Sequence, residues 1–503
     1  MKGLGYLDPQ SSWMPHNLTE SVEAVEWHVL WRNLSFYLNP EDTFNSLFSN
    51  QEVTFWLDSS LIRPGLSRFS FMGDSKGPHS ALIRYFGADC RLFVRRNGQE
   101  SEEKIGIFDY LNRELTNLRC SSPELPFDFT CGFVGYFGYE LKDECGGNRV
   151  NLSPHPDSIF LFADRIIVFD HLDQSVYLVC LSRVGEEKAA DNWLCETESR
   201  LRAVSESAHR PPGQVEASLL FNLEQSRDQY LTNIQKSLDL IRDGISYEIC
   251  LTNRLRSNSQ VNPLDFYLLL RKINPAPYAA FMRFPDVSIA CSSPERFLKI
   301  DSAGLAESKP IKGTARRGVK PEEDENLREL LRTSIKNRSE NLMIVDLLRN
   351  DLGRVCRIGS VNVPHLMEVE SYATVHQLVS TIRGHLNPGV TAVDCVRSAF
   401  PGGSMTGAPK IRTMEIIDQL EPSARGIYSG SLGFLGVNGA TDLNIVIRTA
   451  VFGKDEISIG IGGAIVALSD PDDEYEETLL KSGAILKTFS AMTGDHVQLK
   501  EQD

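Results

Sequence analysis

The chain has 503 residues, of which 41% are hydrophobic and 24% are charged, as is typical of a globular protein with a sizeable core. Acidic residues outnumber basic ones by 67 to 52, and the net charge of −15 argues against a nucleic-acid partner, whose phosphates attract cations. The chain has no membrane-length apolar run, no secretory signal in residues 1–18 and no C-x-x-C pair among its ten cysteines, which predicts a cytoplasmic protein without a membrane partner.

The first half of the chain is rich in predicted strands. Glu52–Asp58 and Ile159–Asp170 are apolar and β-branched and are bounded by turn residues. Thr130–Tyr139 alternates glycine with aromatic residues, which indicates strands whose backbones approach closely. The polar stretch 182–214 contains a helix-like run at Glu186–Ser205 and then H-R-P-P-G, and it is the candidate linker between the two halves.

The second half mixes helices and strands without a regular βαβ order. Ser226–Asp243 repeats apolar residues at helical spacing and stops at Gly244. Ala440–Phe452 and Glu456–Ala467 are predicted to be neighbouring strands joined by a G-K-D turn. This order favours an α+β fold in which large, mostly antiparallel sheets pack against helices.

The predicted organisation has three parts. Residues 1–220 form a strand-rich region that belongs to the same intertwined fold, residues 221–490 form the catalytic region, and residues 491–503 form a tail. Four segments of the catalytic region carry side chains of chemical interest, namely 293–297 (SPERF) with 309–318 (KPIKGTARRG), 339–351 (SENLMIVDLLRND), 400–410 (FPGGSMTGAPK) and 469–478 (SDPDDEYEET).

The last of these segments begins a helix, with Asp470 as its cap and Pro471 at its first position. Glu474 and Glu477 lie three residues apart on one face, and Lys481 follows one turn later. Two carboxylates and a lysine in this arrangement can bind a divalent cation and the anionic group that it holds. A solvated helix face is the alternative.

Glu340, near the start of another predicted helix, is either a partner of the helix dipole or a second cation ligand. If it faces Glu477, the pair forms an oxygen site of the kind that Mg²⁺ prefers, with one or two protein carboxylates and several waters. The glycine-rich segment 400–410 runs into a helix and is either an anion cradle or a tight turn, but it is not a P-loop.

Lys312 and Glu295 are candidates for covalent and acid catalysis. A lysine attacks as a nucleophile only when its amine is neutral, and burial or the nearby Arg316 and Arg317 would lower its pKa in that direction. Glu295 needs the opposite shift, upward through burial, before it can donate a proton. A solvated lysine is the alternative.

In this order the four segments resemble the chorismate-utilising enzymes, a family that includes anthranilate, aminodeoxychorismate, isochorismate and salicylate synthases. The resemblance is strong over residues 221–489, and in the first half it is carried more loosely by L-D-S-S at 57–60, R-F-S-F-M-G at 68–73 and residues 132–141. It implies that Mg²⁺, held by Glu340 and Glu477 with Glu474 in support, binds the ring carboxylate of chorismate. The remaining substrate-binding residues that it implies are Gly313, Thr314, His376, Ser404, Tyr428, Arg448, Gly462, Gly463 and Lys481.

Two positions resemble the aminodeoxychorismate branch of the family. P-I-K-G-T at 310–314 stands where the anthranilate branch has P-I-A-G-T, and P-G-G-S ends at Ser404. The resemblance implies that Lys312 attacks ring C2 as the 4-hydroxyl leaves with a proton from Glu295, and that ammonia then attacks C4 and expels the lysine. The product would be 4-amino-4-deoxychorismate, for p-aminobenzoate and folate synthesis. Glu248 stands where the water-adding relatives have a lysine base, and its role is open.

The resemblance also implies a source of ammonia. No cysteine lies in a G-x-C-x-G turn, so we expect a glutamine amidotransferase as a separate subunit or a fused domain. A cytoplasmic location is expected, and a plastid location if the chain derives from a plant-type precursor. L-D-S-S at 57–60 and N-P-A-P-Y at 274–278 resemble a tryptophan site of related synthases, although a purely structural pocket is favoured. Anthranilate synthase and a ligand-binding homologue without turnover are the alternative functions.

Overall fold

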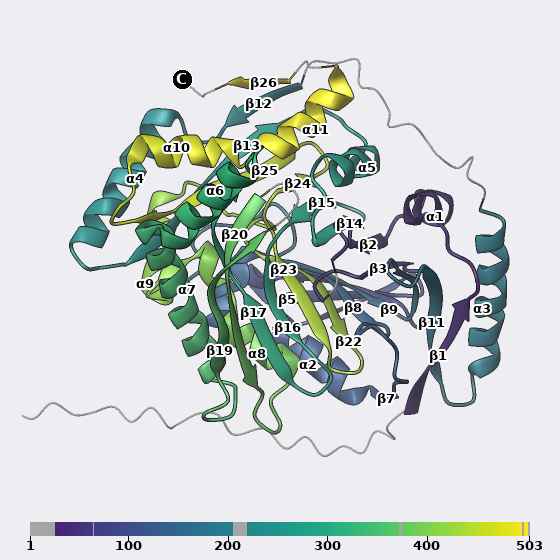
Figure 1. Ribbon diagram of the computed structural model, residues 1–503. Coiled ribbons are helices and arrows are strands. Elements are labelled where there is room, and N and C mark those ends of the chain that lie inside the picture. The colour runs from purple at the N-terminus through teal and green to yellow at the C-terminus, as the bar shows by residue number, and fades with distance from the viewer. Residues whose placement is uncertain (1–25, 64, 205–218, 372–374, 495–496, 501–503) are drawn as a thin grey trace, which may run out of the picture.

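Two large β-sheets form the centre of the molecule, and most helices lie on the outside (Figure 1). The structure is a computed structural model, and it describes residues 26–63, 65–204, 219–371, 375–494 and 497–500. Within these residues every strand pair is antiparallel except two, β1 (Glu26–Leu34) with β7 (Arg119–Ser121) and β12 (Leu219–Leu223) with β26 (Val497–Lys500). The predicted α+β fold with mostly antiparallel sheets is therefore confirmed.

The larger sheet has 14 strands among the described residues, in the order β26-β12-β13-β25-β24-β15-β14-β2-β3-β10-β11-β1-β7, with β21 paired to β13. Their bounds are β1 (Glu26–Leu34), β2 (Thr54–Asp58), β3 (Phe69–Asp74), β7 (Arg119–Ser121), β10 (Arg165–Asp170), β11 (Ser175–Arg183), β12 (Leu219–Leu223), β13 (Glu248–Ser257), β14 (Tyr278–Arg283), β15 (Ser288–Ser293), β21 (Gly407–Ala408), β24 (Thr449–Phe452), β25 (Ile457–Val466) and β26 (Val497–Lys500).

The second sheet has 12 strands among the described residues, in the order β18-β20-β17-β16-β23-β22-β8-β9-β4-β5-β6, with β19 paired to β20. Their bounds are β4 (Ala81–Phe86), β5 (Arg91–Arg96), β6 (Gln99–Glu103), β8 (Gly132–Phe137), β9 (Ser158–Ala163), β16 (Arg296–Ile300), β17 (Leu305–Lys309), β18 (Ile311–Arg316), β19 (Asn362–Ser371), β20 (Val375–His385), β22 (Ser431–Gly436) and β23 (Thr441–Ile445).

The helices surround this pair of sheets, and their amphipathic faces supply part of the core. Within the described residues they are α1 (Pro40–Leu47), α2 (Ile107–Asn117), α3 (Glu187–Arg202), α4 (Arg227–Arg242), α5 (Pro263–Ile273), α6 (Pro321–Thr333), α7 (Ile335–Gly353), α8 (Ala392–Ala399), α9 (Lys410–Leu420), α10 (Pro471–Leu480) and α11 (Gly483–Thr493). No helix of the described residues is both long and apolar enough to span a membrane.

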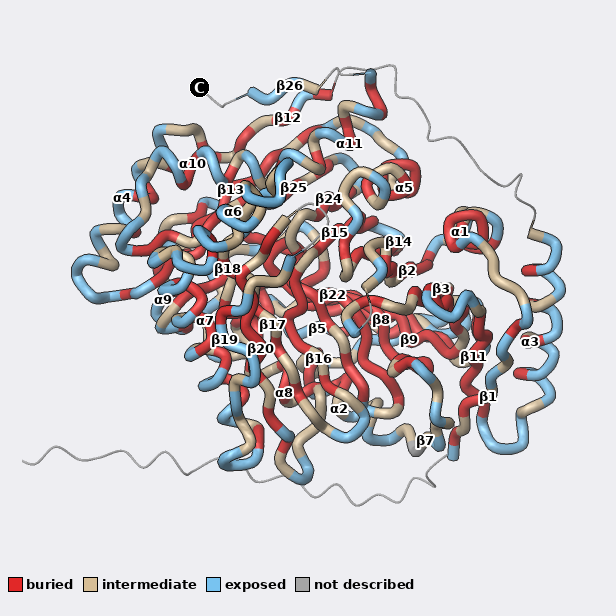
Figure 2. The backbone as a smooth tube through the Cα atoms, viewed as in Figure 1, coloured by how far each residue is buried: buried red, intermediate tan, exposed pale blue. Residues whose placement is uncertain are grey.

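The main hydrophobic core lies between the two sheets. It joins residues of the larger sheet, such as Phe55 and Phe71, to residues of the second, such as Phe133 and Phe160. A second core lies between the other face of the larger sheet and helices that include α5 and α11, where Phe266 packs against neighbouring aromatic rings. Figure 2 shows the result as buried central strands inside a shell of partly exposed helices.

Each sheet combines strands of both halves of the sequence as two adjacent blocks, one block from each half, that meet at a single junction. In the second sheet β8 lies between β22 and β9, and in the larger sheet β2 lies between β14 and β3. Figure 1 shows this mixing as blue β8 and β9 close to yellow-green β22. Within the described residues, the second-half strands of each sheet therefore pair with the first half of the chain only at the ends of their block, at β22 and β14.

Most predicted elements occur, but two predicted strand runs divide between the sheets, Ile159–Asp170 into β9 and β10 and a second run described below. The helix predicted over residues 226–243 is α4, and Gly244 follows it with φ +71°. Ala440–Phe452 was predicted as one strand, but it divides into β23 in the second sheet and β24 in the larger one. The chain crosses between sheets at 446–448, where Arg448 has φ +50°. The H-R-P-P-G run of the predicted linker, at 209–213, lies outside the described residues.

Candidate active site

Lys312 is the centre of a buried cluster of charged side chains. It lies on β18, it is only 8% exposed, and its Nζ donates a hydrogen bond of 2.5 Å to Oε1 of Glu248 on β13. Glu248 is fully buried at the start of β13, where it pairs with Ala408 on one side and Val466 on the other. The lysine is therefore not a solvated surface charge.

The structure corrects the predicted charge state of Lys312. Burial alone lowers the pKa of its amine, but the carboxylates of Glu248 and Glu340 outweigh burial and raise the pKa above the ordinary value. Arg316 and Arg317, predicted to repel the proton, instead form ion pairs with acidic residues of α6. These contacts favour the ammonium form of Lys312, held by Glu248.

Glu295 faces the same cluster from the turn between β15 and β16. Burial raises the pKa of its carboxyl to about 7, and the Ser404 hydroxyl and the Lys312 ammonium oppose part of that shift. The predicted upward shift is therefore present. A carboxylic acid of this kind is partly protonated near neutral pH, so it can donate a proton to a leaving group. Ser404 lies in the short turn Gly403–Met405 of the glycine-rich segment.

Glu340 brings a further carboxylate from α7 towards Lys312. Burial raises the pKa of Glu340 to about 7, although Lys312 lowers it, and Glu248 and Glu474 lie close enough to contribute. No described residue donates a hydrogen bond to Glu340. Lys336, one turn earlier on α7, donates a 2.6 Å hydrogen bond to Glu474 of α10 and so joins the two helices.

The helix α10 begins as the sequence predicts. Asp470 caps it by accepting hydrogen bonds from the backbone N–H groups of two residues in the first turn, and Pro471 is its first residue. Glu474 is buried, and its Oε1 also accepts a hydrogen bond from the Ser469 hydroxyl. The side chain of Glu477 is 51% exposed and forms an ion pair of 2.9 Å with Lys481.

Lys481 connects α10 to the neighbouring strand β25. Its Nζ donates a 3.0 Å hydrogen bond to the carbonyl of Gly462. A Cβ at Gly463 would lie 3.4 Å from Lys481 Nζ and 3.5 Å from Glu474 Oε2, which places this glycine in direct contact range of both charged groups. Gly462, Gly463, Glu474, Glu477 and Lys481 therefore form one cluster.

Tyr428 and Arg448 lie on either side of the crossing between the sheets. The backbone N–H of Ser429 binds the carbonyl of Val446, which ties the two stretches together. The ring of Tyr428 is buried against Gly460 of β25. Burial lowers the pKa of Arg448, and no acidic side chain of the described residues pairs with it. An unpaired, largely buried guanidinium is suited to an incoming carboxylate.

Three further predicted residues lie near the Lys312 strand. Gly313 has φ +89°, and a Cβ there would lie 2.7 Å from the side chain of Asn337 on α7. Thr314 is exposed. His376, on the adjacent strand β20, is buried, with Nδ1 2.8 Å from the Ser371 hydroxyl and Nε2 3.0 Å from Asp324. Within the described residues neither ring nitrogen contacts Lys312 or Glu295.

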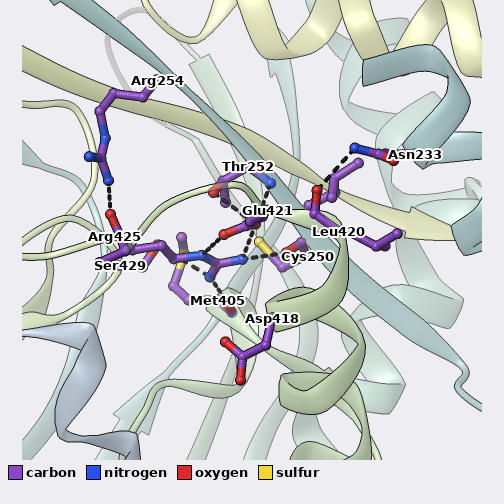
Figure 3. A network of polar contacts seen from close by, with 12 residues as sticks. Asn233, Cys250, Thr252, Arg254, Met405, Asp418, Leu420, Glu421, Arg425 and Ser429 are labelled. Carbon is purple, nitrogen blue, oxygen red and sulfur yellow. Dashed lines mark hydrogen bonds and ion pairs between the residues drawn. The ribbon is translucent and has the colours of Figure 1, made fainter. Parts of the chain in front are cut away.

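A buried network of polar contacts surrounds Arg425 and joins chain segments next to the cluster (Figure 3). The Arg425 guanidinium forms an ion pair with Glu421 and donates hydrogen bonds to the carbonyls of Met405, at 2.6 Å, and Cys250, at 2.7 Å. Glu421 in turn accepts hydrogen bonds from the backbone and hydroxyl of Thr252. One side chain thereby fixes the turn that carries Ser404 against the strand that begins with Glu248.

The sequence did not reveal the roles of Glu248, Lys336 and Arg425. Glu248 and Lys312 are 64 residues apart, so only the pairing of distant strands brings them together. Lys336 had a weak local signal, because it precedes Glu340 by four residues on one helix. Within the described residues no group of three or more His, Cys, Asp and Glu side chains is arranged to hold a metal ion.

The segments with a resemblance to a tryptophan site also meet in the structure. The hydroxyl of Ser60 donates a hydrogen bond of 3.1 Å to the carbonyl of Ala276 and accepts one of 2.9 Å from its N–H. Beside them a cavity of about 340 Å³ lies between the two sheets, with Ser59, Tyr278 and Phe434 in its wall. Its ligand, or a purely structural role, stays a prediction.

The comparison with protein families identifies this arrangement. A model of the family described as chorismate binding enzyme matches residues 72–487. The chain belongs to this family. It is 47% identical over 476 residues to the aminodeoxychorismate synthase of Streptomyces pristinaespiralis, a match that covers 93% of this chain and 66% of that protein. It is 46% identical to a probable chloroplastic aminodeoxychorismate synthase of Oryza sativa subsp. japonica, covering 91% of this chain and 56% of the relative.

The chain thus spans less than two thirds of the length of these two relatives. Among solved structures it resembles anthranilate synthase component I from Streptococcus pneumoniae, with a TM-score of 0.72 and 29% identity. That similarity covers 86% of this chain and 94% of the other. The family and the α+β fold expected from the four sequence segments are both confirmed.

Proposed function

We propose that this chain is the chorismate-aminating component of an aminodeoxychorismate synthase, which converts chorismate and ammonia to 4-amino-4-deoxychorismate. The observation that carries the proposal is Lys312, buried on β18 within a cluster of carboxylates that includes Glu295. The names of the two relatives above and the P-I-K-G-T sequence at 310–314 support the same assignment.

The cluster supplies the groups that two successive displacements require. Lys312, once it has lost its proton, attacks ring C2, and Glu295 gives a proton to the departing 4-hydroxyl. Ammonia then attacks C4 and expels the lysine. A covalent intermediate divides one difficult substitution into two easier ones. Because the pKa of Glu295 is raised to about 7, a useful fraction of it carries the proton that this role needs.

Two carboxylates of the substrate need positive partners in an acidic protein. Arg448, which lacks an acidic partner among the described residues, is proposed to bind the enolpyruvyl carboxylate together with Tyr428 and the backbone at Gly462–Gly463. Lys481 adds positive charge beside these glycines. Gly313, Thr314, His376 and Ser404 are proposed to line the ring side.

Glu340 and Glu477 are proposed to hold Mg²⁺, with Glu474 in support. The donor set fits such an ion, because Glu340 is buried with a raised pKa and receives no hydrogen bond from the described residues. Mg²⁺ also needs only one or two protein carboxylates, so a three-residue cluster is not required. When bound, the ion would supply the positive charge that attracts the ring carboxylate. Titration calorimetry should show Mg²⁺ binding that Glu340→Gln removes.

The ammonia source is proposed to be a glutamine amidotransferase, as a separate subunit or as a fused domain. The proposal rests on the extra length of the two relatives, of which this chain covers 66% and 56%.

The function is tested by incubation of the chain with chorismate, Mg²⁺ and ammonium chloride, followed by mass spectrometry. We expect a product that is converted to p-aminobenzoate only after aminodeoxychorismate lyase is added. Direct formation of anthranilate and pyruvate would instead support the second candidate, anthranilate synthase, which the likeness to the Streptococcus pneumoniae structure favours. Binding without turnover would identify a ligand-binding homologue.

A further inference from the structure

Glu248 has an unused oxygen at the centre of the site. Its Oε1 accepts the hydrogen bond from Lys312, whereas Oε2 is buried and has no hydrogen-bond partner among the described residues. The residue as a whole is 0% exposed, so bulk water does not solvate this oxygen. Burial of a carboxylate oxygen without a donor is unfavourable, and native sites rarely leave one in that state.

Two other buried acids, Glu140 and Glu421, use both of their carboxylate oxygens. Glu140 accepts backbone N–H groups of Arg425 and Gly426, one on each oxygen, at 2.9 and 2.8 Å. Both oxygens of Glu421 accept hydrogen bonds from Arg425. These residues have structural roles that exhaust their carboxylates. The free Oε2 of Glu248 therefore indicates a ligand that donates a hydrogen bond.

The local charges restrict the kind of ligand. Glu248 interacts electrostatically with Glu295 and with Glu340, and all three carboxyl groups interact with Lys312. Such surroundings repel an anion and favour a small neutral or cationic N–H donor. The geometry adds a second restriction, because a donor on Oε2 shares one carboxylate with Lys312 and so lies beside its Nζ.

We propose that Glu248 binds the ammonia nucleophile on Oε2 while Oε1 holds Lys312. The inference rests on the proposed function, in which two nitrogen nucleophiles attack ring carbons C2 and C4 in turn. One carboxylate that holds both nitrogens would present them to C2 and C4, the two ring carbons on either side of C3. Pre-positioning a reactant in this way converts an encounter from solution into a reaction within the site.

The proton and bond changes balance around Glu248. Lys312 passes a proton to Glu248 and bonds to C2, while the C4–O bond breaks and the oxygen leaves as water with the proton of Glu295. Ammonia on Oε2 then bonds to C4 as the bond between C2 and Lys312 breaks, and Lys312 departs as a neutral amine. Glu248 returns its proton to Lys312, and the new C4 ammonium gives one to Glu295. The resting ion pair is restored.

The test measures steady-state amination with chorismate and varied ammonium chloride at one pH, for wild type, Glu248→Ala, Glu248→Gln and Tyr247→Phe. Tyr247 is the 61% exposed neighbour and serves as the matched control. Glu248→Ala is expected to raise the KM for ammonia about tenfold or more, since a hydrogen bond to a charged group is lost. Glu248→Gln, which keeps an oxygen acceptor, should raise it about threefold, and the KM for chorismate should stay within about twofold.

The outcomes separate the two proposals. Absence of product from wild type at every ammonium concentration would overturn the proposed function itself. An active wild type together with a Glu248→Ala ammonia KM within about twofold of it would overturn only the ammonia site. A rise in the KM for chorismate alone would also overturn the ammonia site, because Glu248 would then contact the substrate ring or hold a water. If the Ala variant is unfolded or inactive, the ammonia KM of Glu248→Gln decides.

Discussion

At the scale of single residues, the site depends on a lysine that is buried but remains charged. Burial favours the neutral amine, and the acids around Lys312 reverse that preference, so its pKa is raised. The proposed nucleophile is consequently held as an ammonium ion until a proton acceptor and a substrate are in place. Glu248 is the nearest acceptor, 2.5 Å from Nζ.

Replacement of the nucleophile gives the most direct prediction. Lys312→Ala should reduce kcat for amination by on the order of 10³-fold, because the covalent route is lost and direct substitution by ammonia is slow. The matched control is Lys309→Ala, which removes a lysine three residues away whose partner is Glu370. Mass spectra of the wild-type protein, quenched during turnover, should contain a covalent chorismate-derived adduct that the Lys312→Ala protein lacks. Equal rates for the two variants would contradict the assignment.

The pH dependence should report Glu295. Its folded-state pKa is raised from 4.5 to about 7, so the proton needed for the leaving hydroxyl is present below that pH and lost above it. At a fixed concentration of free ammonia, kcat/KM should fall as the pH rises above about 7. Glu295→Gln should lower kcat by about 10²- to 10⁴-fold and remove this limb of the profile. A falling limb that persists in the variant would assign the proton to another group.

Sequence reasoning reached the site residues only where their chemistry is carried by local sequence. Lys312, Glu295 and the helix start at Asp470 stand in short segments whose spacing is readable. The partner of Lys312 was not readable, because Glu248 meets it only through the pairing of distant strands. The predicted effect of Arg316 was wrong for the same reason, since α6 supplies an acid that sequence distance did not reveal.

At the scale of elements, the two-residue strand β21 fixes the position of Glu248. Ala408 and Gly407 pair with Glu248 and Ile249 on β13, and the backbones approach so closely that a Cβ at Gly407 would lie 1.9 Å from the Glu248 carbonyl. Gly407 also has φ +134°, a conformation that side chains disfavour. Gly407, the last glycine of the F-P-G-G-S-M-T-G segment, is thus needed for a close backbone contact. The sequence pattern alone could not distinguish this role from that of an anion-binding loop.

Comparison of Gly407→Ala with a control glycine variant should therefore separate the free-energy cost of a steric collision from the cost of backbone strain. Gly389 is the matched control, with φ +84° and no atom within 4 Å of an added Cβ. Gly389→Ala should cost about 1 kcal/mol of unfolding free energy through backbone strain alone. Gly407→Ala should cost about 1–3 kcal/mol more because a buried backbone must move, and it should lower amination as Glu248 shifts. Chemical denaturation and kcat measure both effects. Equal losses of unfolding free energy in the two variants would show that β13 shifts away from the added Cβ at no additional cost.

At the scale of the whole molecule, the sequence predicted the class of fold but not its layering. Apolar, β-branched runs indicated several strands, including the run Ile159–Asp170, which the structure divides into β9 and β10. The same pattern does not reveal which sheet a strand joins. The predicted strand Ala440–Phe452 failed for that reason, because its two parts lie in different sheets and Arg448 turns the chain between them.

Because each sheet is completed by strands from both halves of the chain, we predict that the two halves cannot fold separately. Removal of residues 1–220 would take β8 from beside β22 and β2 from beside β14, which leaves β22 and β14, now interior strands, as exposed edges. It would also remove Phe55, Phe71 and Phe133 from the core between the sheets. A fragment of residues 221–503 should therefore show no cooperative thermal unfolding and no Mg²⁺ or chorismate binding, whereas the full chain unfolds in one transition. Differential scanning calorimetry tests this directly, and a fragment that unfolds cooperatively within about 5 °C of the full-chain Tm would establish an autonomous catalytic domain.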